Sequence, residues 1–155
     1  MAMALAFALT ESLGLAGPVP SPKFSAIVVG PTRQVTLCAI VADPNDLMVD
    51  PKLEQIQGQL RKLLPKHGFR LIDVQSKSLE VGQSVRCETA QGVQARSELV
   101  NVLDAHGKVQ LRVSLELTGG LPQFSTVVNT PPNQFFFVDQ PILDGRRLLI
   151  GIGAR

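Results

Sequence analysis

The chain has 155 residues, a length that suits one domain with a buried core. Its 15 basic and 13 acidic residues leave a net charge of +2, which is too small to draw the whole molecule to nucleic acid or to an anionic membrane. Apolar residues make up 45% of the sequence and charged residues 18%, a balance that excludes a disordered chain and favours a domain rich in apolar strands.

The first 22 residues differ in composition from the rest. The apolar run MAMALAFAL is followed by a small-residue, Pro-rich stretch, as in a secretory signal peptide, but no Lys or Arg precedes the run. We therefore expect residues 1–22 to be a signal-like segment or a flexible N-terminal helix, and residues 23–155 to form one domain. The run is short of the about 20 apolar residues that a transmembrane helix needs. The signal-like start favours a periplasmic or extracellular location over a cytoplasmic one.

Two continuous apolar runs come next, Lys23–Gly30 and Gln34–Asp43. Runs of this kind are typical of strands that are buried on both faces. Cys38 lies in the second run, and Cys87, the only other cysteine, has similar strand-like surroundings. These surroundings favour two buried free thiols, with a single disulfide as the alternative.

One amphipathic helix follows. Asp50 is a good N-cap, Pro51 suits the first helical position, and Pro65 with Gly68 ends the helix. Apolar residues recur about every 3.6 residues and predict a stripe that packs on a sheet. The stripe consists of Leu53, Ile56, Leu60, Leu63 and Leu64.

From Phe69 onward apolar and polar residues alternate, which predicts strands separated by turn residues at intervals of about 8–12 residues. Gln91-Gly92, His106-Gly107 and Asp144-Gly145 mark expected hairpin turns. The cleanest alternation runs from Lys108 to Leu117. Its inward-facing residues are expected to be Val109, Leu111, Val113, Leu115 and Leu117, with Gln110, Arg112, Ser114 and Glu116 facing water.

Three consecutive phenylalanines, Phe135 to Phe137, lie in the next-to-last predicted strand. In a strand Phe135 and Phe137 point to one face, while Phe136 points to the other. The pattern favours burial on both faces beneath a second layer, and an exposed contact patch around Phe136 is the alternative.

Together these elements predict an α+β fold in which one amphipathic helix packs on a mostly antiparallel sheet, sandwich or open barrel of about seven to nine strands. The strand–helix–strand opening, from Gln34 to Val74, is expected to form a small split βαβ unit.

Few residues suit catalysis, cofactor binding or metal binding. His67 and His106, the only histidines, fall in expected loops, and neither zinc-site spacing nor a nucleophile motif is present. Asp43, Asn45 and Asp46 have oxygens that suit calcium, but their spacing breaks the calcium-loop pattern, so a turn before the helix cap is favoured. An enzyme that uses Asp43 or Asp46 with His67 is the least favoured function, and we predict no cofactor and no metal.

Basic residues gather near the end of the predicted helix. Arg61, Lys66, His67 and Arg70 lie within ten residues of sequence, and Arg147 follows much later in the chain. The cluster is favoured to be a solvated helix end; the alternative is a small-ligand or anion site at the mouth of a β-barrel.

Several motifs follow one another in a set order. They are Asp50-Pro51-x-Leu53, Leu63-Leu64-Pro65, Phe69-Arg70-Leu71-Ile72, Ser78-Leu79 and Val81-Gly82-Gln83, before strands that end in Leu-Leu-Ile-Gly-Ile. In this order the chain resembles small secreted bacterial proteins of unassigned function that carry a helix followed by a β-domain. The closing Phe-Val-Asp and Asp-Gly-x-x-Leu-Leu-Ile are similar to the closing strands of periplasmic domains in outer-membrane secretion assemblies. The resemblance covers residues 34–153, transfers no catalytic residue, and implies an exported binding or assembly role.

The expected function is therefore a non-enzymatic, exported bacterial interaction or assembly domain. It would bind a protein partner or a second copy of itself by strand addition, with Phe136 exposed at an apolar edge strand. Nucleic acid is not an expected partner.

Overall fold

The computed structural model describes residues 31–89, 92–117 and 122–155. The signal-like segment 1–22, the predicted strand Lys23–Gly30 and the Gln91 position of a predicted turn lie outside the described residues.

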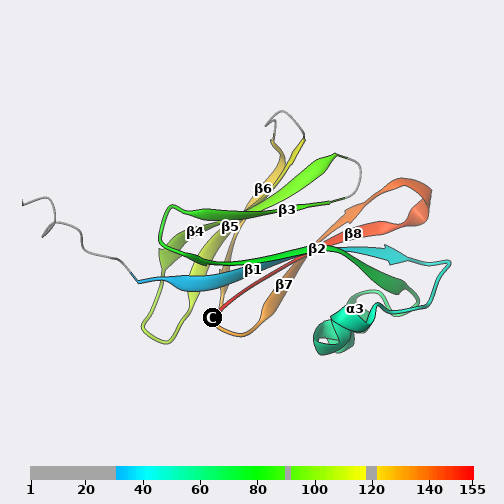
Figure 1. The fold of residues 1–155 in the computed structure, drawn as a ribbon, viewed down its shortest axis with the longest axis horizontal. Helices are drawn as coiled ribbons and strands as arrows, with labels where there is room; N and C mark the ends of the chain where they lie inside the picture. The colour runs from blue at the N-terminus through cyan, green and yellow to red at the C-terminus, as the bar shows by residue number, and fades with distance from the viewer. Residues whose placement is uncertain (1–30, 90–91, 118–121) are drawn as a thin grey trace, which may run out of the picture. The chain divides into compact units, whose positions relative to one another are not determined.

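Two four-stranded antiparallel sheets make up the described part of the chain and form a sandwich (Figure 1). Sheet A has the order β2-β1-β8-β7, with β1 Arg33–Asp43, β2 Gly68–Leu79, β7 Phe135–Pro141 and β8 Arg147–Ala154. Sheet B has the order β3-β4-β5-β6, with β3 Ser84–Glu88, β4 Val93–Val102, β5 Val109–Leu117 and β6 Pro122–Thr130. The predicted fold class is confirmed, with the sandwich rather than a closed barrel as its architecture.

The predicted split βαβ unit is wrong. Strands β1 and β2 are antiparallel neighbours, from the pair Arg33↔Leu79 to the pair Asp43↔Gly68. Just before the helix the chain returns to this pair, where Val49 forms a parallel bridge to Phe69. The helix is therefore an insertion in a wide hairpin connection between the antiparallel strands β1 and β2.

The helical segment begins as the 3₁₀ helix η2, Pro51–Ile56, and continues as α3, Gln57–Leu63. Asp50 is its N-cap, as predicted, and its Oδ1 accepts a hydrogen bond from the Lys52 N–H at 3.0 Å. Leu53 and Leu60 are buried, but Leu63 is 49% exposed, contrary to the predicted stripe. The predicted stripe assumes about 3.6 residues per turn throughout. The first six residues form a 3₁₀ helix with about 3.0 residues per turn, so residues before and after Gln57 do not keep the spacing of one continuous α-helix.

Sheet A is covered on both of its faces. Its inner face packs on sheet B, while Leu53 and Leu60 pack on its outer face with Phe69 and Leu149. The side chains of β1 alternate between these two cores, as the continuous apolar run predicts. Val35, Leu37, Ala39 and Val41 face sheet B, and Cys38, Ile40 and Ala42 face the helix side.

Strand β5 follows its predicted alternation with two exceptions. Leu117, at the end of the strand, is 39% exposed, although an inward position is predicted. Ser114 is buried, although it lies on the outer face of sheet B. Ion pairs flank it there, Arg96 with Glu116 at 4.0 Å and Arg112 with Glu98 at 3.0 Å, and these long side chains cover the small one.

Candidate functional site

A groove runs along the outer face of sheet A beside the helix, and we call it the outer-face groove. Two adjoining pockets form it, with volumes of about 370 Å³ and about 330 Å³, and Thr36, Gln55 and Phe135 line both. Its apolar end is lined further by Cys38, Lys52, Leu53, Ile56, Leu71 and Val74. Its polar end is lined further by Gln34, Asn133, Gln134, Gly153, Ala154 and Arg155.

Two glycines of β8 shape the neighbouring part of this face. Phe135 and Phe137 pair with Gly153 and Gly151, and their rings stack with centroids 6.1 Å apart at an interplanar angle of 25°. A Cβ on Gly151 would lie 2.8 Å from the Cys38 Sγ and 2.9 Å from the Phe137 ring. The absence of a side chain at Gly151 and at Gly153 therefore lets both rings lie across β8, and Phe135 reaches the groove beside β1.

Cys38 borders the groove, but its thiol is a poor nucleophile. Burial raises the pKa of Cys38 to about 11, against a smaller lowering by a hydrogen bond with the Gly151 backbone. Burial also raises the pKa of Cys87 to about 12, with a further contribution from the negative charge of Asp73. Both cysteines are buried and free, so at neutral pH they are protonated thiols.

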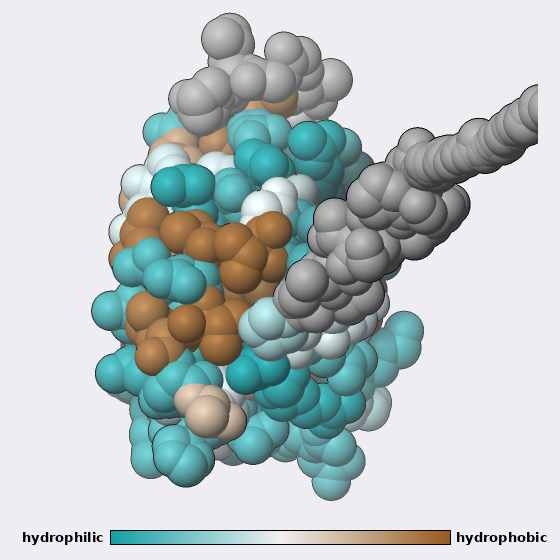
Figure 2. All heavy atoms as spheres, turned by 90° about the vertical axis from the view of Figure 1, so that its left-hand side faces the viewer, coloured by the Kyte–Doolittle hydropathy of each residue, from teal (hydrophilic) through white to brown (hydrophobic). Residues whose placement is uncertain are grey.

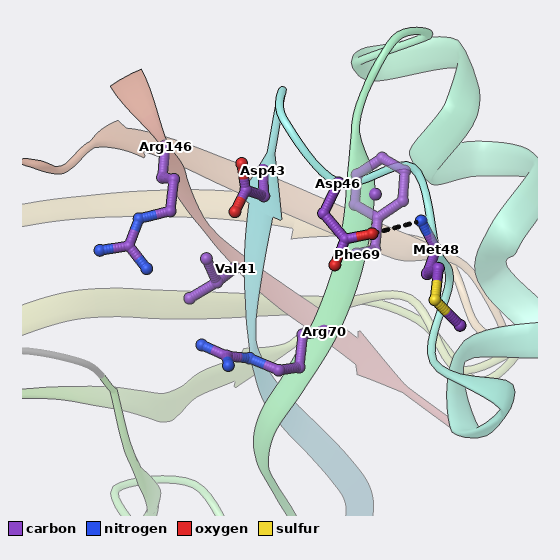
Figure 3. Close-up of a pocket in the computed structure, with 8 residues that line it drawn as sticks. Val41, Asp43, Asp46, Met48, Phe69, Arg70 and Arg146 are labelled. Atoms are coloured by element: carbon purple, nitrogen blue, oxygen red, sulfur yellow. Dashed lines mark hydrogen bonds between the residues drawn. The ribbon is translucent and has the colours of Figure 1, made fainter. Parts of the chain in front are cut away.

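A smaller, charged pocket lies where β1 gives way to the loop before the helix (Figure 3). Arg70 and Arg146 extend on either side of Val41, and Asp43 and Asp46 lie nearby. Its volume of about 90 Å³ is well below the roughly 300 Å³ at which pockets for drug-sized ligands usually begin.

The acidic residues before the helix have the predicted turn roles. Asp43 Oδ1 accepts from the Asn45 N–H at 2.8 Å, and Asp46 Oδ1 accepts from the Met48 N–H at 3.0 Å. In the described part of the chain, no group of three His, Cys, Asp or Glu residues is placed to hold a metal ion. No hydrogen bond joins His67 to Asp43 or Asp46 there, so the acid–base arrangement of the least favoured function does not form.

The predicted basic cluster does not converge on one site. Arg61 and Lys66 are exposed, Arg70 lines the small charged pocket, and the Arg147 Nε donates to Asp139 Oδ1 at 2.6 Å. His67 is half-buried, not solvent-facing as predicted, and its Nδ1 finds no partner among the described residues.

Phe136 departs from the favoured prediction of burial on both faces. It is 40% exposed, whereas Val138, on the same face of β7, is buried between the sheets. Phe135 and Phe137 are half-buried against the helix-side core. Strand β7 is an edge of sheet A, so the inner face of the sandwich is open to solvent at Phe136.

A further apolar patch lies at one end of the sandwich (Figure 2). Two exposed apolar residues follow strands elsewhere in the fold: Val81, 52% exposed after β2, and Leu103, 39% exposed after β4. The two segments are held together by Gly82 and Gln83, which exchange backbone hydrogen bonds with Leu99.

Among the residues that line the outer-face groove, Lys52, Gln55 and Val74 were not predicted as functional. One signal was available for the groove. Gly151 and Gly153 alternate in β8 with the same period as Phe135 and Phe137 in the preceding strand, which is typical of rings packed over glycines.

No family model, curated protein or solved structure matches the chain. Among the described residues, no helix has both the length and the apolar character to cross a membrane.

Proposed function

We propose that the protein is a non-enzymatic, exported assembly domain that binds a second copy of itself by strand addition at β7. The observation that carries this proposal is Phe136, a large apolar side chain 40% exposed on an edge strand. Export is supported by the signal-like composition of residues 1–22.

The first four residues of β7 lack the features that usually protect an edge strand from pairing, and its charged residue and its proline, Asp139 and Pro141, lie in the last three. Native edges are commonly blocked by Lys, Pro or inward-pointing charges. Strand β2, the other edge of sheet A, carries the exposed Lys77, whereas β7 has no charged residue from Phe135 to Val138. Among the described residues, no strand pairs with the second edge of β7.

Antiparallel pairing of two β7 strands about a two-fold axis at Phe136 would be self-complementary. It would set Phe136 opposite its own copy and Phe135 opposite Phe137 of the second copy. Aromatic cross-strand pairs of this kind contribute roughly 0.2–1 kcal/mol each. Asp139 would lie beyond these rings, opposite Asn133 of the second copy, so no like charges would meet. The two A sheets would then form one continuous sheet.

The test is size-exclusion chromatography with light scattering on dilute and concentrated samples of the full chain. The wild-type protein should form a dimer as its concentration rises, and Phe136→Lys should remain a monomer, because the two new charges would lie opposite each other. Val127→Lys is the matched control. Val127 is 46% exposed on β6, the edge strand of sheet B, so this variant should still dimerise.

A wild-type monomer at every concentration would overturn the proposal. So would a dimer that survives Phe136→Lys, or one that Val127→Lys abolishes to the same extent. Thermal unfolding of each variant checks that the lysine changes association rather than folding.

A further inference from the structure

We infer that the outer-face groove binds a small amphiphilic carboxylate, a molecule with one apolar body and one carboxylate head. This inference does not depend on the β7 pairing proposed above, although Phe135 belongs both to the groove and to β7. The inference stands on the shape of the groove, its apolar lining and the charges at its rim.

The apolar end of the groove has the size and lining of a ligand site. Its volume of about 370 Å³ lies within the range of roughly 300–1,000 Å³ that such sites occupy. Leu53 is buried at its wall, Ile56 and Leu71 are half-buried, and Val74 is 48% exposed at the rim. An apolar body placed here would remove the exposed parts of Ile56, Leu71 and Val74 from water, which stabilises the complex by about 25 cal/mol per Å² of apolar surface.

The charges around the groove favour a single anion. Lys52 and Arg155 line it, and neither pocket has an Asp or Glu in its lining. The Arg155 Nε donates to Gln34 Oε1 at 3.3 Å, whereas the Lys52 ammonium makes no ion pair with any described residue. Lys52 is therefore the cation available at the apolar end of the groove, and Arg155 keeps further guanidinium N–H donors at the polar end.

The polar neighbours of Lys52 suit a carboxylate head. Gln55 lines both pockets, and its amide N–H₂ group has no hydrogen-bond partner among the described residues. A carboxylate only accepts hydrogen bonds, so it matches an ammonium and an amide donor. The protonated Cys38 thiol at the groove offers no nucleophile, so binding is reversible and non-covalent.

Octanoate and 1-octanol are suitable probes, because they share a chain length and differ in the head group. Titration calorimetry on the full chain should show saturable, one-to-one binding of octanoate, with 1-octanol weaker. Lys52→Gln should weaken octanoate binding roughly two- to five-fold, as expected for an exposed ion pair, and leave 1-octanol unchanged. Lys62→Gln is the matched control, because Lys62 is an exposed residue of the same helical segment that lines neither pocket.

Val74→Glu should abolish the binding of both probes, since it places a negative charge at the rim of the apolar end. Val74→Gln, which adds no charge, should weaken both and serves if the Glu variant is poorly folded. The inference is overturned if the wild-type protein shows no saturable octanoate binding or if both Val74 variants bind like the wild type. The assignment of the head group to Lys52 is overturned if Lys52→Gln and Lys62→Gln affect octanoate equally.

Discussion

The same substitution, Gly to Ala, should have opposite effects at two positions of this chain. In β8, an Ala Cβ at Gly151 would lie 2.8 Å from the Cys38 Sγ and 2.9 Å from the Phe137 ring, so these side chains would have to move. Overpacking of this kind costs about 1–3 kcal/mol, and the preference of strands for Ala over Gly offsets roughly 0.5–1 kcal/mol of it. Gly151→Ala should therefore lower the free energy of unfolding by up to roughly 2.5 kcal/mol.

Gly58 lies in α3, and a Cβ built on it meets no atom within 4 Å. Gly58→Ala should raise the free energy of unfolding by about 0.5–1 kcal/mol, because Ala has the higher helix propensity. Urea unfolding followed by circular dichroism measures both variants, and the slope with urea should stay constant. A Gly151→Ala protein as stable as the wild type would refute the account of the rings packed across β8.

Three further predictions concern stability. Leu60→Ala should cost about 2–5 kcal/mol in urea unfolding, whereas Leu63→Ala should change stability by less than about 0.5 kcal/mol; similar losses at both positions would contradict the helix phase described above. Asp50→Ala should lower the free energy of unfolding by about 1 kcal/mol, and Asp50→Asn should lower it less. Equal melting temperatures for the wild type and both variants would rule out a stabilising N-cap at Asp50. The pKa values of the Cys38 and Cys87 thiols are raised from 9.0 to about 11 and about 12 in the folded protein. The free energy of unfolding should therefore be highest below pH 9.0 and fall as the pH rises towards these values, because the unfolded chain loses the thiol protons first. In urea unfolding from pH 8 to pH 11, the free energy of unfolding should fall less in the double Cys→Ala variant than in the wild type. An identical fall in both proteins would refute the assignment of this pH dependence to the thiols.

Local chemistry accounts for the elements that the sequence predicts correctly. Asp50 and Pro51 mark the start of the helix because the cap and the missing N–H act within one turn. The continuous apolar run of β1 predicts burial on two faces, and the structure places a core on each side of it. Gly107 and Gly145 have positive φ angles of 105° and 74°, which explains why both predicted turns form where they do.

The order of strands in sheet A has no comparable local signal. Strand β8 lies between β1 and β7, although β1 is far from it in sequence, and only tertiary packing selects this neighbour. The outer-face groove depends on the same arrangement, because Phe135 of β7 reaches the β1 side only across the glycines of β8. The basic cluster near the end of the helix is a case in which closeness in sequence does not bring side chains to one pocket. Its residues are close in sequence, but Arg70 lies in a strand and Arg61 lies on the helix, so their side chains separate.

The position of β8 also has a consequence for how the chain folds during synthesis. Sheet B joins strands that are neighbours in sequence, and β1 pairs with β2 across one connection, so both units are able to form early. The other edge of β1 pairs with β8 and so has no partner until residues 147–154 have been synthesised. The last hydrogen bonds along this edge join the backbones of Gln34 and Arg155, at 2.8 Å and 3.0 Å. Pairing across such a long sequence separation is slow. Until it occurs, the apolar β1 presents an open edge, and a nascent chain at that stage is the species most exposed to aggregation and to capture by chaperones.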